Sequence, residues 1–86
     1  MKNTLIIPDE TRRISLKASQ KVRVETNGRS VRLQAGDNTV FIKAKASGDD
    51  SDAFPVHSGN CVEFCGAVTV FSEQDTEVFC LFYTTL

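Results

Sequence analysis

The chain has 86 residues, of which 41% are hydrophobic and 24% charged, and its net charge is −1. This length suits one domain and is too short for two independent cores, so we expect residues 1–86 to form a single folded domain. Its apolar runs fall short of the roughly 18 residues that a membrane-spanning helix needs, so we expect neither such a helix nor a membrane as partner. A net charge near zero argues against nucleic acid as the main partner.

The charges are divided between the two halves of the chain. Residues 1–45 hold all ten Lys and Arg, whereas residues 46–86 hold seven acids and no base. In one interpretation, strands from the two halves alternate in the fold and the charges neutralise one another. In the other, the protomer is a dipole whose basic face meets the acidic face of the next copy in a heterologous, salt-sensitive contact.

Apolar and polar residues alternate along most of the chain, which predicts β-strands. The first predicted strand is at residues 14–18. Asn27-Gly28 then predicts a type I′ hairpin, because both residues tolerate positive φ, and this hairpin pairs Val24 with Val31. Its outer face would carry Lys21, Arg23 and Arg32, a basic surface without interleaved aromatic residues that suits an acidic protein partner.

The remaining predicted strands are short. Residues 39–46 form one, with the lysines outward, and residues 47–52 form a polar loop. Residues 53–57 form an edge strand, since Pro55 cannot donate to a ladder. The last three strands are at residues 61–65, 67–71 and 76–84. Seven or eight short strands predict an all-β protein, an antiparallel sandwich or a jelly-roll-like barrel.

The final strand is apolar on both faces over residues 78–83, so both faces need cover. Either one face meets a second copy, or the N-terminal Leu5, Ile6 and Ile7 cap it. The first alternative makes Phe79, Leu81 and Tyr83 candidate interaction residues of a homo-oligomer.

No pattern of residues predicts catalysis. The chain has an odd number of cysteines, Cys61, Cys65 and Cys80, which suggests free thiols. The single histidine, His57, has no nucleophile or acid at a spacing typical of a catalytic site. A zinc site from these four residues is conceivable, but their spacing differs from the usual paired ligands. We therefore expect that the protein is not an enzyme and that it binds no metal ion and no cofactor.

The C-terminal part contains the segments FPVHSG (residues 54–59), FCGAVTV (64–70) and CLFY (80–83). This pattern of a proline-containing edge, a glycine turn and a closing aromatic strand resembles small all-β accessory proteins of bacteriophages and prophages. The resemblance implies a virion structural or decoration subunit that docks on a phage head or tail, located in the virion or the bacterial cytoplasm. Residues 1–8 also lack the apolar core of a signal peptide, so secretion by that route is not expected.

These observations favour a non-enzymatic structural module that self-associates and docks on a larger assembly. The alternatives are a cupin-like barrel that binds a small molecule and an interaction module with a nonviral partner. A single histidine argues against a metal-binding cupin.

Overall fold

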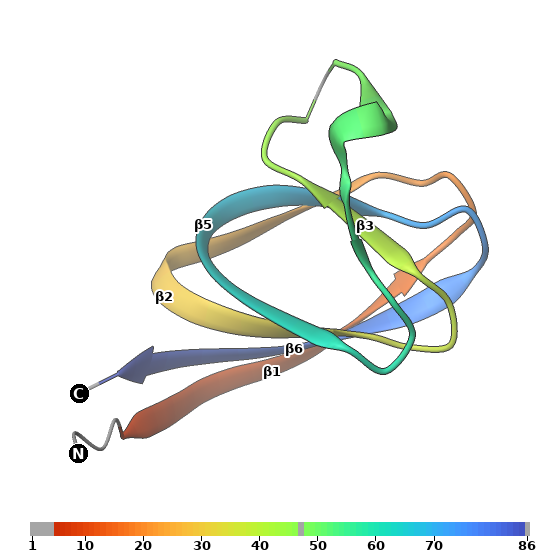
Figure 1. Cartoon of the computed structure of the whole chain (residues 1–86). Coiled ribbons are helices and arrows are strands. Elements are labelled where there is room, and N and C mark those ends of the chain that lie inside the picture. Colours follow the sequence, from red (N-terminus) through yellow and green to blue (C-terminus); the bar gives the residue numbers. More distant parts are fainter. Residues whose placement is uncertain (1–4, 47, 86) are drawn as a thin grey trace.

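The computed structural model describes residues 5–46 and 48–85, and within these ranges the protein is all-β. The six strands and one short 3₁₀ turn, η1, are β1 (Ile6–Leu16), β2 (Val22–Ala35), β3 (Val40–Lys43), η1 (Asp50–Asp52), β4 (Phe54–Val56), β5 (Cys61–Phe71) and β6 (Thr76–Thr85). All neighbouring strands are antiparallel and form one open, strongly curved sheet in the order β1-β6-β2-β5-β3-β4 (Figure 1).

The strand order places the two halves of the chain in alternation. Strands β1, β2 and β3 come from the basic half, and each lies next to β6, β5 or β4 from the acidic half. Ion pairs therefore cross between neighbouring strands, as in Arg13–Glu77 at 3.7 Å and Arg32–Glu63 at 3.4 Å. The alternating interpretation of the charges is confirmed, and a protomer with separate basic and acidic faces is wrong.

The hairpin predicted at Asn27-Gly28 is also wrong. Both residues do adopt positive φ, at 54° and 83°, but the chain bends there without reversing, and β2 continues to Ala35. The strand β5 bends with it at Gly66, where φ is 115°, so β2 pairs with β5 on both sides of the bend. Figure 1 shows these two long strands curving together. Val24 consequently pairs with Val68, and Val31 pairs with Phe64 and Phe82.

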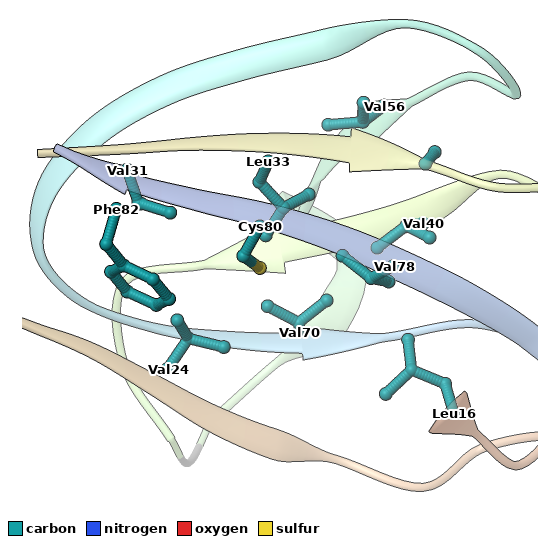
Figure 2. Packing of buried hydrophobic residues seen from close by; sticks show 11 residues of the cluster. Leu16, Val24, Val31, Leu33, Val40, Val56, Val70, Val78, Cys80 and Phe82 are labelled. Carbon is teal, nitrogen blue, oxygen red and sulfur yellow. The ribbon is translucent and has the colours of Figure 1, made fainter. Parts of the chain in front are cut away.

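The bend curves the open sheet around a single core. Val24 lies before the bend and Val31 and Leu33 lie after it, yet all three are fully buried in one cluster with Phe82 of β6 and Val70 of β5 (Figure 2). The cluster also includes Leu16, Ala35, Val40, Val56, Val78 and Cys80. Burial of these aliphatic side chains is the main stabilising contribution to the fold.

The described ranges contain six strands, fewer than predicted, because two pairs of predicted strands are continuous. The segments 22–24 and 31–33 both belong to β2, and the segments 61–65 and 67–71 both belong to β5. The all-β antiparallel class is confirmed, whereas a sandwich or barrel of seven or eight strands is not. The short edge strand β4, which contains Pro55, is confirmed.

Two predictions of burial are wrong. The segment Leu5-Ile6-Ile7 does not cap β6, because Ile6 and Ile7 extend β1 at the edge of the sheet and stay exposed. Lys43, predicted to point outward, is buried, and its ammonium donates to Asp50 Oδ1 at 2.8 Å and to the carbonyls of Gly48 and Asp49 at 3.2 Å. The hydrogen bonds that Lys43 and Lys21 donate to Asp50 lower the pKa of this carboxyl group. Together with its bonds to the two carbonyls, Lys43 fastens the 48–50 loop to β3.

Candidate functional site

Four strands present a continuous surface on the side of the sheet away from the core, which we call the outer face. Its residues form three rows across β1, β6, β2 and β5, because directly paired residues lie on the same side of a sheet. Two rows cross all four strands, Arg13–Phe79–Gln34–Cys61 and Thr11–Leu81–Arg32–Glu63. The third row, Tyr83–Ser30–Cys65, crosses β6, β2 and β5.

A groove of about 490 Å³ runs along the outer face over β1, β6 and β2. Phe79 and Leu81 form its apolar floor, and Phe79 is 39% exposed. Arg13 and Arg32 stand at its sides, with the Arg13 guanidinium 5.6 Å from the Phe79 ring centre. An exposed aromatic floor between arginines is the composition that is enriched at protein–protein contacts.

The third apolar candidate on the outer face, Tyr83, is buried. Its hydroxyl donates to a carboxylate oxygen of Glu63, two strands away across β2. This bond, with Arg32, holds the pKa of Glu63 below its usual value, and the same bond raises the pKa of Tyr83. Tyr83 therefore links β6 to β5 and offers little surface to a partner.

The basic candidates do not form one group. Arg32 lies on the outer face beside Leu81. Lys21 lies instead near the 48–50 loop, 2.9 Å from Asp50 and above the Phe71 ring. Arg23 donates to Thr69 Oγ1 and to the carbonyl of Ala44. The prediction of a shared basic face for Lys21, Arg23 and Arg32 is wrong, because it depended on the Asn27-Gly28 hairpin.

The structure also contains a charged cluster that sequence analysis missed, on the inner side of β1. Arg29 reaches from the bend in β2 to both Asp9 and Glu10. Arg12 bonds Glu10 at 2.8 Å, and the guanidiniums of Arg12 and Arg29 lie 4.8 and 4.6 Å from the centre of the Phe82 ring. The signal in the sequence was the run Asp9-Glu10-Thr11-Arg12-Arg13, two acids and two bases around a neutral residue.

The cysteines and the histidine do not converge. Cys61 and Cys65 are exposed on the outer face, whereas Cys80 is buried in the core (Figure 2). His57 is exposed, with its Nδ1 3.4 Å from Thr39 Oγ1. In the ranges 5–46 and 48–85, no three His, Cys, Asp or Glu side chains are grouped to hold a metal ion.

The different environments of the thiols predict different reactivities. Burial raises the pKa of Cys80 to about 11, so its thiol stays protonated at neutral pH, and only the thiolate is nucleophilic. We expect a maleimide to label Cys61 and Cys65 of the folded protein within minutes and Cys80 only after unfolding. Peptide mass mapping measures the order, and equal labelling of all three thiols would contradict the buried position of Cys80.

Comparisons of the chain with protein-family models, with curated proteins and with solved structures find no match. None of the helical structure in the described part of the chain is long and apolar enough to cross a membrane.

Proposed function

We propose that the protein is a non-enzymatic interaction module that self-associates and docks on a larger assembly, with the outer face as its docking surface. The observation that carries this proposal is the groove over β6, in which the exposed Phe79 and the partly buried Leu81 lie between Arg13 and Arg32. The resemblance of residues 54–83 to phage accessory proteins suggests a virion as the assembly, and this particular assignment depends on the resemblance alone.

The design of the outer face supports this proposal. Arg13 and Arg32 are only partly engaged by Glu77 and Glu63, and their side chains are 67% and 42% exposed. Arginine supplies several donors in a fixed plane, so each guanidinium retains donors for a carboxylate of a partner. A partner with an apolar side chain flanked by acids would satisfy both the floor and the sides of the groove.

The alternative of a cupin-like ligand barrel receives less support. The interior of the curved sheet, where such a barrel holds its ligand, is filled by Leu33, Phe82 and the other buried side chains of the core (Figure 2). The groove that could receive a molecule is on the outer face, and its floor is apolar and open.

Replacement of Phe79 by serine tests the role of the outer face. Phe79→Ser removes the exposed aromatic floor, and we expect the concentration for half-maximal self-association to rise about tenfold, as for an interface anchor worth more than about 1 kcal/mol. Light scattering over a concentration series measures the mass. Phe54→Ser, which changes a 62% exposed phenylalanine on the distant β4, is the matched control. Identical mass curves for Phe79→Ser and the unmodified protein would contradict the role of this face in self-association.

A further inference from the structure

The strand β1 has a long edge without a partner. It is the first strand of the sheet, and on its side away from β6 it pairs with no other strand of the described residues. Pro8 and a β-bulge between Pro8 and Glu10 interrupt its first part, but residues 10–16 continue without interruption, whereas the opposite edge strand β4 has three residues, one of them Pro55. An exposed edge presents backbone donors and acceptors that can pair with another chain, and proteins usually shorten or block such edges.

The charges along this edge are arranged in mirror order. Asp9 and Glu10 precede Thr11, and Arg12 and Arg13 follow it. If two copies of β1 pair antiparallel about Thr11, Glu10 of each copy faces Arg12 of the other, and Asp9 lies in the β-bulge of β1 next to this pair. Two contacts between opposite charges result, related by the symmetry axis, and directly opposed charges of this kind stabilise paired strands.

We propose that two copies of this chain form a two-fold symmetric dimer by antiparallel pairing of their β1 strands, with Thr11 on the symmetry axis. This inference rests on the proposed function and deepens it by naming a second contact, besides the outer face, through which the module self-associates.

The charge order selects this register over the alternatives. Antiparallel pairing centred on Glu10 would place the two Glu10 side chains opposite each other, and pairing centred on Arg12 would do the same for Arg12. Parallel pairing in register would oppose every charge with its own copy. Repulsion in competing arrangements gives specificity as effectively as attraction in the preferred one.

The cluster on the inner side of β1 prepares these charges for pairing. Arg29 bonds both Asp9 and Glu10, and Arg12 is held between Glu10 and the Phe82 ring. Hydrogen bonds from Arg12 and Arg29 lower the pKa of Glu10, which keeps it ionised. Side chains that are already ordered lose less conformational entropy on association. A carboxylate has two oxygens, so Glu10 has acceptor capacity for its own Arg12 and for that of a second copy.

The dimer would also join the two docking surfaces. Thr11 and Arg13 line the outer-face groove, so pairing about Thr11 places the grooves of the two copies next to each other across the axis. A two-fold contact uses the same patch on both copies and closes the assembly at two. The outer face is left free for docking or for further association.

Two substitutions of opposite charge at Thr11 test whether this residue lies on the symmetry axis. Thr11 is exposed, and only pairing centred on it places this residue against itself. We expect Thr11→Glu and Thr11→Lys each to weaken dimerisation at least about tenfold, because like charges then meet on the axis. An equimolar mixture of the two variants should recover the dimer as a heterodimer, detected by native mass spectrometry. Ser15→Lys, on the same side of β1 but four residues away from the axis, is the matched control and should leave the dimer intact.

A second pair of variants tests the register through the inner side. Arg12→Glu and Glu10→Arg should each be monomeric, and their mixture should dimerise, since every opposed pair is again of opposite charge. Circular dichroism verifies that each variant is folded. The results of both pairs are independent of the result for Phe79→Ser. A dimer that persists in Phe79→Ser but is lost in the Thr11 variants supports the edge contact and contradicts self-association through the outer face.

Three results would overturn the inference. The first is an unmodified protein that is monomeric at every concentration, and the second is a dimer that tolerates both Thr11→Glu and Thr11→Lys. The third is a pair of monomeric, folded Thr11 variants whose mixture stays monomeric, which would contradict the Thr11-centred register. If Phe79→Ser still reduces the mass in the second case, the outer face mediates self-association and the proposed function stands without the edge dimer.

Discussion

Replacement of Phe82 by alanine is expected to destabilise the protein by about 3–5 kcal/mol, the cost of removing a large aromatic side chain from a core. Phe82 is completely buried between Val24 and Val31, on the two sides of the bend in β2. The guanidiniums of Arg12 and Arg29 lie over its ring, and the alanine variant also loses the stabilisation from these cation–π contacts. A domain of this size has a free energy of unfolding of roughly 4–13 kcal/mol, so the variant loses a large part of its stability.

Urea unfolding followed by circular dichroism measures this change. Phe54→Ala is the matched control, because Phe54 is 62% exposed and a surface substitution changes the free energy of unfolding by within about 0.5 kcal/mol. Similar free energies for the two variants would contradict the central position of Phe82 in the core.

Replacement of Gly36 by alanine is expected to cost about 3 kcal/mol, at the upper end of the usual penalty for overpacking. The backbone N–H of Gly36 donates to the carbonyl oxygen of Glu77 at 2.9 Å, and this bond joins the end of β2 to β6. A Cβ atom at Gly36 would lie 2.5 Å from the same oxygen, so one of the two backbones must move.

Gly59→Ala separates this steric effect from the strain of a left-handed conformation. Gly59 has a φ of +80°, but a Cβ there meets no atom within 4 Å. We therefore expect Gly59→Ala to cost only about 1 kcal/mol, which is typical of conformational strain at such positions. Thermal unfolding of both variants measures the difference, and a smaller effect at Gly36 than at Gly59 would contradict the close approach of β2 to β6.

The sequence predicts individual strands well because alternation records which residues face a core. Val24 is buried and Arg23 and Glu25 are exposed, as alternation in the segment 21–25 implies. Pro55 correctly marks an edge strand. The dipeptide Asn27-Gly28 correctly indicates positive φ, but the same dihedral angles serve a reversal or a bend. Which of the two forms depends on β5, whose Gly66 lies opposite the bend and far away in the sequence.

The candidate site depends on strand order, which local patterns do not contain. Arg32 joins Leu81 on the outer face because β6 pairs with β2, and Lys21 and Arg23 are separated from them by the bend. Lys43 fits the alternating pattern of an exposed residue, yet loop carbonyls and Asp50 satisfy its charge inside the fold. The charge order around Thr11 was present in the sequence, but its meaning depends on β1 being an edge strand.

The solution mass of the unmodified protein at low and high salt tests the central claim, self-association, most directly. We predict a mass of at least twice the 9.5 kDa of one chain at low salt. The opposed charges on the β1 edge lie near the surface, so salt should screen them and shift the protein toward the monomer. A monomer at every protein and salt concentration would contradict self-association through the β1 edge and through the outer face alike.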